Sequence, residues 1–402
     1  MPKVLIIGGG QAGFQVADSL TKVEGGPHVV LLCGKRHLPY QRPPLSKKHL
    51  AGKISEKRLF FRPYDFYERR GINVITGVTV TSVNSELKIV TTDQGDSFSY
   101  DTLVFATGAR VREFPNSREL GLKYIRGIDD IAAIREGLEA AESVILIGGG
   151  FIGLEAAATI KELGKSVTVI EAMPHLMPNL IAPILSDYYR KTHEEKGVTV
   201  ITGAKVSGIQ KENDCYSVAL EDGRSARADM VIVGIGVIPN TELAESIGLA
   251  TERGILVDEN GRTQNPDIYA VGDCAHGMHM LFGARTRLES VQNAVDQSIA
   301  VASHILGDPK PYSSLPWFWS DQYELKLQMA GLSRGFEDYV VRGDMASGKF
   351  SICYFKGGTL IAVDSISKPA DHLAAKRLIE GGISPTRDQC KKDEISLKSL
   401  LK

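Results

Sequence analysis

The sequence has little of what disulfide-linked, membrane-spanning or nucleic-acid-binding proteins need. Its five cysteines are scattered and never form C-x-x-C, a pattern typical of reduced thiols. No uninterrupted apolar run is long enough to span a bilayer, and the short apolar N-terminal stretch runs directly into glycines, unlike a signal peptide. The net charge of -1 offers no excess of one sign for nucleic acid or anionic membrane. We therefore expect a cytoplasmic globular protein whose 402 residues form two or three domains.

Glycine, in contrast, is abundant, and its most informative occurrences repeat. Residues 4–13 (VLIIGGGQAG) and 144–153 (VILIGGGFIG) each place a short apolar strand before G-x-G-x-x-G and a helix. Such a turn lets the backbone approach a pyrophosphate, while free amides and the dipole at the helix N-terminus attract its charge. A single copy would be weak evidence, because glycine turns also serve ordinary strand-to-helix packing.

Two further blocks repeat in the same order. Residues 71–77 (GINVITG) are matched by 197–203 (GVTVITG), and residues 101–108 (DTLVFATG) by 229–236 (DMVIVGIG). Three matched pairs indicate two whole modules, and hence two bound dinucleotides between which electrons pass. A further strand-like segment at 267–273 (DIYAVGD) belongs to neither copy. It suggests that the second module is inserted within the first.

These patterns predict an α/β fold with two Rossmann-like dinucleotide-binding domains, one inserted in the other, and a C-terminal α+β domain with an antiparallel sheet. In the second module we expect a helix over 152–163 and a strand over 166–170. After a proline-containing linker, alternating apolar residues predict antiparallel strands, Gly357 and Gly358 a hairpin turn, and the charged tail beyond about residue 384 a surface helix. The predicted domains are residues 1–111 with 246–314, residues 112–245, and residues 315–402.

In the second module, the residue after the second strand indicates which nucleotide is bound. Glu171 follows its second strand, about twenty residues after the glycine loop, where a carboxylate can accept hydrogen bonds from both hydroxyls of an adenosine ribose. The same charge would repel a 2'-phosphate, so NADH is favoured over NADPH; the alternative is a surface glutamate at a strand end. The first module has Cys33, Gly34, Lys35 and Arg36 at this point. Its ribose carboxylate is therefore missing or comes from elsewhere, and the two cations either meet phosphate or are solvated.

Several segments together resemble the NADH-dependent ferredoxin reductases, flavoproteins similar to putidaredoxin reductase and to the reductase components of aromatic-ring dioxygenases. The match covers essentially the whole chain. It includes residues 38–47 (LPYQRPPLSK), 106–110 (ATGAR), 148–155, 236–240 (GVIPN), 271–275 (VGDCA), 289–294 (ESVQNA) and 316–322 (PWFWSDQ). The resemblance implies FAD in the first module, NADH in the second, a C-terminal domain over the flavin, a two-iron ferredoxin as electron acceptor, and a monomer or weak homodimer.

The resemblance also implies which residues bind the cofactors. Asp273, at a strand end, suits a ribityl hydroxyl, whereas Val80 reads equally well as a core strand residue. The implied FAD contacts are Gly8, Gly10, Ala12, Gly13, Arg42, Lys47, Val80, Thr107, Gly108, Arg126, Asp273 and Val291. The implied NAD contacts are Gly148, Gly150, Ile152, Gly153, Glu155, Glu171 and Gly236.

Three residues are candidates for the chemistry itself. In relatives with the same segments Lys47 and Glu155 face each other, and we expect their ion pair to set the electrostatics at the flavin and to gate nicotinamide entry. The alternative is that Lys47 only holds FAD and that Glu155 is a helix acid favoured by the dipole. Trp319 is expected to cover the flavin edge or to pack in the C-terminal core. Basic residues at Arg62, Arg285, Arg287 and Lys326 are expected to meet an acidic ferredoxin or to form a solvated mixed surface.

Two other activities use the same two-module plan. A disulfide or peroxide reductase would place a redox cysteine near residues 40–46, where this chain has none; Cys33 lies earlier and Cys274 is unpaired. An apoptosis-inducing-factor-like protein would use the fold as an NADH-controlled interaction module. The short chain and the missing targeting segment disfavour that alternative.

Overall fold

The computed structural model describes residues 1–178 and 180–401. They divide into two compact units, each built from three separate stretches of chain. The first unit contains residues 1–41, 57–110 and 237–314, and the second contains residues 42–56, 111–236 and those from 315 on. The chain leaves the first unit within β8 (Ala109–Val111) and returns to it at β17 (Val237–Pro239). The predicted three-domain division stays a prediction.

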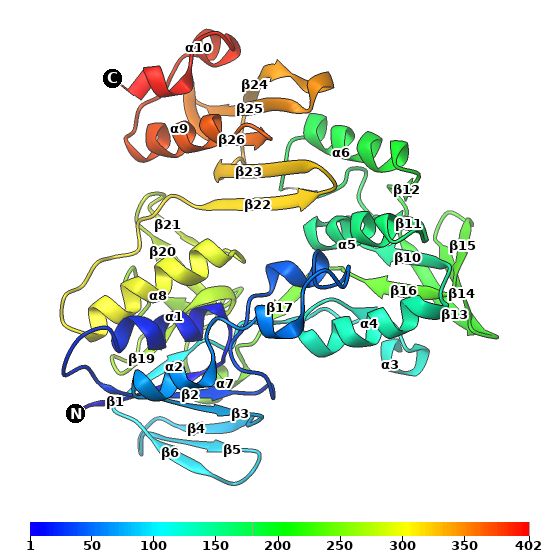
Figure 1. The fold of residues 1–402 in the computed structure, drawn as a ribbon. Helices are drawn as coiled ribbons and strands as arrows, with labels where there is room; N and C mark the ends of the chain where they lie inside the picture. Colours follow the sequence, from blue (N-terminus) through cyan, green and yellow to red (C-terminus); the bar gives the residue numbers. More distant parts are fainter. Residues whose placement is uncertain (179, 402) are drawn as a thin grey trace. The chain divides into compact units, whose positions relative to one another are not determined.

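The first unit is built on a parallel sheet with strand order β19-β7-β1-β2-β3. Its central strand is almost wholly apolar because both of its faces are buried: Val4 and Ile6 belong to one core cluster, and Leu5 and Ile7 to the other. Helices α1 and α8 lie side by side against this sheet (Figure 1). The bounds are β1 (Lys3–Ile7), β2 (His28–Cys33), β3 (Ile72–Thr76), β7 (Thr102–Phe105), β19 (Ile268–Ala270), α1 (Gln11–Leu20) and α8 (Val291–Ile305).

Smaller elements complete the first unit. Two three-stranded sheets, β4-β5-β6 and β18-β20-β21, belong to this unit as well. In the sequence the first comes between β3 and β7, and the strands of the second lie on either side of β19. Their bounds and those of the short helices are β4 (Val80–Asn84), β5 (Ile89–Thr92), β6 (Ser97–Ser99), β18 (Ile255–Val257), β20 (Ala275–His279), β21 (Ala284–Thr286), α2 (Tyr64–Arg69), α7 (Glu242–Ser246) and the 3-10 turn η3 (Gly272–Cys274).

The second unit repeats the parallel plan with strand order β12-β11-β10-β16-β9. The helix predicted over 152–163 is α5 (Phe151–Glu162), and the strand predicted over 166–170 is β11 (Ser166–Ile170), so both are confirmed within one residue. The remaining bounds are α3 (Ser117–Leu120), β9 (Lys123–Tyr124), α4 (Ile128–Ala140), β10 (Ser143–Ile147), α6 (Pro183–Glu195), β12 (Thr199–Ile201), β13 (Val206–Glu212), β14 (Cys215–Leu220), β15 (Ser225–Ala228) and β16 (Met230–Val233).

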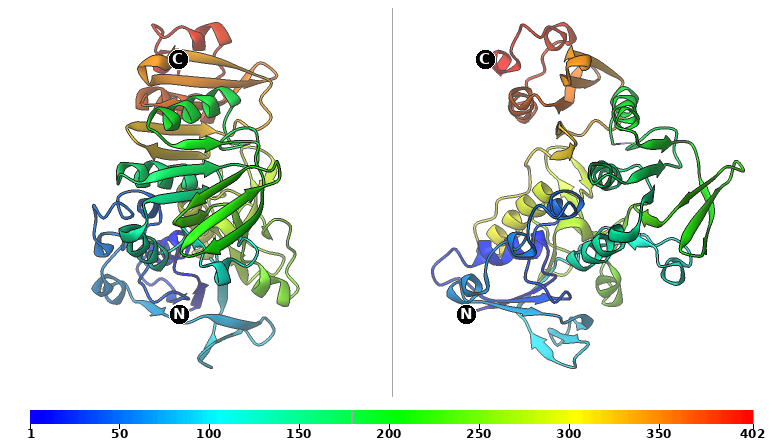
Figure 2. Two further views of the ribbon diagram at one scale, coloured as in Figure 1. Left: turned by 90° about the vertical axis from the view of Figure 1, so that its right-hand side faces the viewer. Right: turned by 45° about the vertical axis from the view of Figure 1, so that its right-hand side comes forward.

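The C-terminal part of the second unit is an antiparallel sheet, β22-β23-β26-β25-β24. The right-hand view of Figure 2 shows α9 and α10 on one side of this sheet and α6 on the other. Gly357 and Gly358 both have positive φ (54° and 74°) and join β25 to β26 directly, which confirms the predicted hairpin turn. The bounds are β22 (Trp317–Gln322), β23 (Leu325–Gly331), β24 (Asp338–Asp344), β25 (Lys349–Lys356), β26 (Thr359–Ile366), α9 (Pro369–Glu380) and α10 (Arg387–Lys391).

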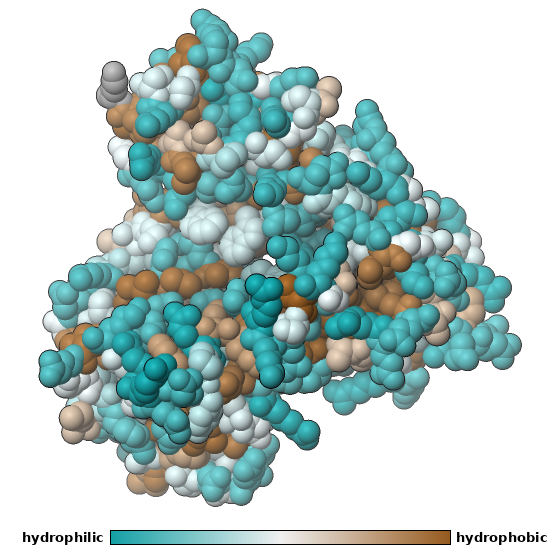
Figure 3. All heavy atoms as spheres, in the orientation of Figure 1, coloured by the Kyte–Doolittle hydropathy of each residue, from teal (hydrophilic) through white to brown (hydrophobic). Residues whose placement is uncertain are grey.

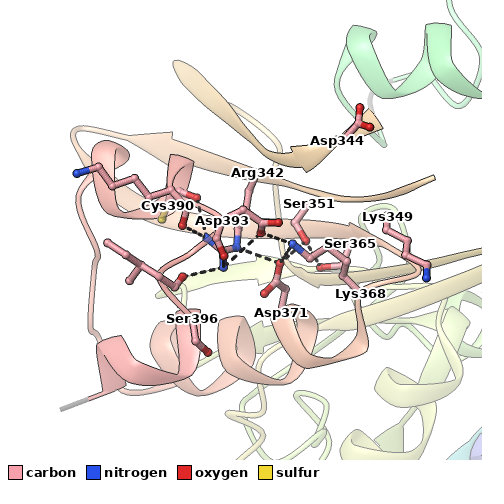
Figure 4. A network of polar contacts seen from close by, with 12 residues as sticks. Arg342, Asp344, Lys349, Ser351, Ser365, Lys368, Asp371, Cys390, Asp393 and Ser396 are labelled. Carbon is pink, nitrogen blue, oxygen red and sulfur yellow. Dashed lines mark hydrogen bonds and ion pairs between the residues drawn. The ribbon is translucent and has the colours of Figure 1, made fainter. Parts of the chain in front are cut away.

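One buried arginine holds the C-terminal tail (Figure 4). Arg342 on β24 is 2% exposed and donates to Asp371 on α9 at 3.1 Å. Its guanidinium also donates to four tail carbonyls, those of Cys390, Lys392, Asp393 and Ile395. The predicted surface helix is therefore wrong in part: the described residues of the tail, up to 401, form α10 and a 3-10 turn (Leu397–Leu401), and they contribute Cys390 and Leu397 to the core.

The predicted fold class is confirmed, because two parallel sheets with covering helices are accompanied by a C-terminal antiparallel sheet. Within residues 1–178 and 180–401, no helix has both the length and the apolar character needed to cross a bilayer. The face drawn in Figure 3 is largely hydrophilic, with hydrophobic residues in groups among hydrophilic ones.

Candidate functional site

The first glycine loop joins β1 to α1 in the first unit. Gly8 adopts a φ of 119°, and a Cβ added there would lie 2.1 Å from the carbonyl oxygen of Ala106. A Cβ on Gly13 would lie 1.9 Å from the carbonyl oxygen of Gly8. These two glycines are therefore required by close packing of the loop against β7 and the helix.

The middle glycine of this loop has a different environment. A Cβ on Gly10 would meet no atom within 4 Å, so open space lies beside the backbone where α1 begins. No side chain caps this helix end, and its first-turn amides point toward that space. A cradle with free amides, a helix dipole and room for phosphate oxygens fits the pyrophosphate of a dinucleotide.

The second glycine loop, between β10 and α5, has the same geometry. Gly148 has a φ of 108°, and its Cβ would lie 2.3 Å from the carbonyl oxygen of Gly234; that of Gly153 would lie 2.3 Å from the carbonyl oxygen of Gly148. Gly150 again faces open space at an uncapped helix start. Beside this loop the side chain of Ile152 is 47% exposed. The loop fits a second dinucleotide.

The two loops differ in what stands at the end of the next strand. The amide of Gly148 donates to Ile170 and that of Gly8 to Leu32, which makes Glu171 and Cys33 equivalent positions. Glu171 is 8% exposed, and its carboxylate accepts from the backbone amides of Gly149 at 2.7 Å and Met173 at 2.8 Å. These bonds fix the carboxylate beside the glycine loop, while its remaining lone pairs are available to ribose hydroxyls.

In the first unit Cys33 takes this position as an uncharged thiol. Burial raises the pKa of Cys33 to about 12, and a Cβ on Gly9 would lie 2.3 Å from its sulfur. The residue packs against the loop and offers no carboxylate. The sequence leaves Cys33, Gly34, Lys35 and Arg36 open for this position, and the strand register identifies Cys33 as the residue equivalent to Glu171.

A buried ion pair lies at the second turn of α5 in the second unit. The Lys47 ammonium is 2.6 Å from the Glu155 carboxylate, and the side chains are 18% and 5% exposed. Ser46 donates to the same carboxylate oxygen at 2.5 Å, and Ser320 on β22 donates to the other oxygen at 2.7 Å. The predicted pairing of Lys47 with Glu155 is confirmed, and both serines were missed. Neither serine has a periodic or spacing signal, because their convergence depends on the tertiary fold.

The segment that carries Lys47 is anchored to α5. Thr159 donates to the carbonyl of Ser46 at 2.9 Å, one helical turn beyond Glu155. In the same unit Arg42 donates to the carbonyl oxygen of Arg126 at 2.7 Å. Two predicted FAD residues, Arg42 and Arg126, are thus brought together by the second unit.

The other predicted FAD residues lie in the first unit. Thr107 and Asn240 exchange two hydrogen bonds of 2.8 Å, which fixes the turn after β7 next to Gly108. Asp273 lies in η3, directly after β19. Val291 is the first residue of α8. Val80 packs in a hydrophobic core cluster, which agrees with its alternative role as a core strand residue.

Trp319 lies on β22, the edge strand of the C-terminal sheet. It is half-buried, and its ring lies 5.5 Å from that of Trp317 between centroids, with the two planes tilted by 32°. Phe318, on the opposite face of the strand, contacts Phe151 at 4.8 Å. Edge placement and partial exposure leave Trp319 accessible to a ligand, in contrast to a core residue.

Two cysteines bear on the disulfide-reductase alternative. Cys274 is fully buried, and burial raises the pKa of its thiol; the pKa of Cys33 is raised by the same cause. A redox cysteine needs an accessible thiolate. Both residues therefore behave as small hydrophobic side chains.

Comparisons with known proteins place the chain among reductases. The sequence profile of pyridine nucleotide-disulphide oxidoreductases matches residues 2–298, and that of the reductase C-terminal domain matches residues 317–401. The 5,5'-dehydrodivanillate O-demethylase ferredoxin reductase subunit of Sphingobium is 38% identical over 98% of this chain and 97% of its own. Putidaredoxin reductase of Pseudomonas putida is 36% identical over 99% and 96%.

Solved structures agree with this result. The ferredoxin reductase for the CYP199A2 system from Rhodopseudomonas palustris has a TM-score of 0.96 at 39% identity and covers both chains completely. The reductase in the covalent putidaredoxin reductase–putidaredoxin complex has a TM-score of 0.96 at 35% identity, over 100% of this chain and 98% of that one. The resemblance to NADH-dependent ferredoxin reductases is confirmed, and the chain belongs to the pyridine nucleotide-disulphide oxidoreductase family.

Proposed function

We propose that this protein passes electrons from NADH, through FAD, to a two-iron ferredoxin that supplies a monooxygenase or dioxygenase. The observation that carries the proposal is the duplicated glycine loop, with open space at Gly10 and Gly150 and a carboxylate, Glu171, at only one of the two. Relatives over the full chain length are named as ferredoxin and putidaredoxin reductases. Ferredoxin as acceptor and FAD with NADH as cofactors are consistent with those names.

In this assignment the first loop holds FAD and the second holds NADH. FAD held at the first loop would supply the flavin chemistry that accepts a hydride from a nicotinamide and passes on single electrons. The amides at the starts of α1 and α5 bind the two pyrophosphates. Glu171 accepts hydrogen bonds from the ribose hydroxyls of NADH, and its negative charge repels a 2'-phosphate.

Lys47 and Glu155 are proposed to supply the local charge for hydride transfer. Glu155 holds the Lys47 ammonium at 2.6 Å, in a position that two serines and a backbone carbonyl also fix. A positive charge at a defined position favours negative charge that develops next to it. Trp319 is proposed to cover the flavin edge.

Steady-state reduction of a two-iron ferredoxin by NADH tests the function. The purified protein should be yellow, contain one FAD per chain and turn over rapidly. A protein that takes up FAD, forms a long-lived complex with NADH and delivers few electrons would support the apoptosis-inducing-factor-like alternative. A colourless protein that takes up no FAD would contradict both assignments.

Lys47→Ala tests the charge, with Lys48→Ala as the matched control, because Lys48 is the next residue and is exposed. We expect flavin reduction by NADH to slow by about 10–100-fold in Lys47→Ala. Unchanged flavin content together with an unchanged reduction rate would remove the proposed role. Lys48→Ala should match the wild type in both.

The proposed ferredoxin contacts differ in exposure and in their present partners. Arg62, Arg285 and Lys326 are exposed, whereas Arg287 is partly buried and paired with Glu289. Arg285 donates to the carbonyl of Val257 at 2.6 Å, and Arg62 donates to the carbonyl of Phe61 at 2.9 Å. We expect turnover with ferredoxin to fall as ionic strength rises, since salt screens exposed charge pairs. The two-iron cluster type, the cytoplasmic location and a monomeric or weakly dimeric state are parts of the same proposal.

A further inference from the structure

A chain of hydrogen bonds leads away from Glu155 within the second unit. Gln322 donates to the hydroxyl of Ser320 at 3.2 Å, and its carbonyl oxygen lies 2.9 Å from Nε2 of His193. The hydroxyl of Tyr323 lies 3.3 Å from Nδ1 of the same histidine. Together with the bond from Ser320 to Glu155, five side chains from α5, α6 and the β22–β23 hairpin are connected.

The direction of every bond in this chain is fixed. The Glu155 carboxylate only accepts, so Ser320 must donate to it and must in turn accept from the Gln322 amide. The amide then presents its oxygen to His193, whose Nε2 must carry the proton. Nδ1 is consequently the acceptor for the Tyr323 hydroxyl. All donors point toward Glu155, an order in which each bond polarises the next.

Burial and backbone geometry are consistent with a fixed arrangement. His193 and Ser320 are 0% exposed and Gln322 is 1% exposed. Burial lowers the pKa of His193, which keeps the imidazole in the neutral form that the bond pattern requires. Tyr323 adopts a φ of 53° in the two-residue turn between β22 and β23, a backbone conformation that non-glycine residues seldom adopt. A two-residue hairpin turn requires a positive φ at its first central residue, so the turn itself fixes the backbone of Tyr323.

We propose that His193, Gln322 and Tyr323 are positioning residues for hydride transfer: through Ser320 they hold the Glu155 carboxylate, and thereby the Lys47 ammonium, in the orientation that the reaction uses. This inference rests on the proposed function. It assigns α6 and the β22–β23 hairpin a role in the reaction rate, although neither carries a residue of the glycine loops. The amide of Gln322 fixes orientation and does not carry protons, so the chain is a positioning device.

His193→Phe and His193→Gln provide the first test. Phenylalanine leaves the Gln322 carbonyl without its donor, so the amide is free to turn its oxygen toward Ser320 and compete with Glu155. We expect flavin reduction by NADH in stopped flow to slow by about tenfold, with the NADH dissociation constant changed less than about twofold. Glutamine places an amide donor near Nε2 and should restore most of the rate.

The matched control is Tyr189→Phe. Tyr189 lies on the same helix, one turn before His193, is fully buried, and its hydroxyl makes no hydrogen bond in the described structure. The variant should reduce flavin at the wild-type rate. Should His193→Phe not fold, Tyr323→Phe carries the test, since it keeps the turn and removes only the hydroxyl; the expected slowing is about threefold.

A measurement that does not depend on flavin, the NMR shifts of the His193 ring nitrogens, completes the test. In apoprotein with 15N-labelled histidine, the nitrogen shifts of His193 should show the neutral Nε2–H tautomer at pH 7. An imidazolium, or the Nδ1–H tautomer, would overturn the inference, as would wild-type hydride transfer in His193→Phe or equal slowing in Tyr189→Phe. If wild-type protein is not reduced by NADH, the proposed function fails instead, and the tautomer result is unaffected.

Discussion

The two glycine loops have nearly the same backbone geometry, but the residue at the end of the strand that follows each loop differs in charge. In both, the first and third glycines are enforced by contacts of 1.9–2.3 Å to backbone oxygens, and the middle glycine faces open space. At the end of the following strand, however, one loop has an uncharged, buried Cys33 and the other a Glu171 carboxylate held by two amides. The fold therefore preserves the phosphate cradle, whereas the identity of the nucleotide depends on one side chain that the cradle does not constrain.

The largest expected difference between the units is in how their stability depends on pH. In the second unit Asp364 is fully buried and accepts a hydrogen bond from Tyr354 at 2.6 Å, and burial raises its pKa to about 7. The unfolded chain releases this proton near pH 4, so the folded state binds more protons between pH 4 and 7. The contribution of Asp364 to the free energy of unfolding is therefore fully present below pH 4. It is lost as the pH rises to 7, by up to about 4 kcal/mol.

Asp364→Asn should remove this loss while keeping an acceptor for Tyr354. The measurement is the free energy of unfolding in urea at pH 4.5 and pH 7, with the exposed Asp388→Asn as control. A variant whose stability changes with pH as the wild type does would show that Asp364 is ionised throughout this range.

The next largest effect separates the packing glycines from the open ones. Gly148→Ala should destabilise the second unit by about 1–3 kcal/mol, because its Cβ would collide with a backbone oxygen at a positive φ. Gly150→Ala should change the free energy of unfolding by less than about 1 kcal/mol and yet weaken NADH binding at least about tenfold. Urea unfolding and NADH titration measure the two quantities. Equal stability losses in both variants would contradict the distinction between a glycine required by packing and a glycine that faces open space.

Glu171→Ala tests whether the charge that distinguishes the second loop from the first selects the nucleotide. We expect NADH to bind about tenfold more weakly, because the ribose hydroxyls lose their acceptor, while the affinity for NADPH stays equal or rises. The comparison is the ratio of kcat/KM for the two nucleotides, with Glu162→Ala, on the same unit, as a control for net charge. An unchanged ratio would make Glu171 a structural residue of the loop.

The smallest effect is expected at the equivalent residue of the first unit. Cys33→Ala should leave FAD content unchanged, because the thiol is buried and uncharged and offers the ribose no acceptor. Alkylation of the native protein at pH 8 should modify Cys215, which is partly exposed, well before Cys33. Loss of FAD in Cys33→Ala would instead assign the thiol a direct contact.

The features that sequence predicted best are local ones. The glycine loops, the helix after Gly150 and the Gly357–Gly358 turn are determined by backbone conformations that few residues adopt. The convergence of Ser46 and Ser320 on Glu155 was not predictable, because these residues are distant in sequence and hydroxyls occur everywhere. The position equivalent to Glu171 could be narrowed only to residues 33–36 for a related reason: strand register is fixed by the hydrogen bonds of Gly8 and Gly148, and these have no signature of their own in the sequence.

The guanidinium of Arg342 makes the C-terminal sheet depend on a segment that adds no strand to it. It is buried on β24, yet four of its acceptors are the backbone carbonyls of Cys390, Lys392, Asp393 and Ile395. If that segment detached from the sheet, a charged group would stay buried without most of its hydrogen bonds, which is far more costly than the loss of a surface contact. Residues 390–395 therefore act as a clasp, and cutting the chain within them should loosen the whole antiparallel sheet.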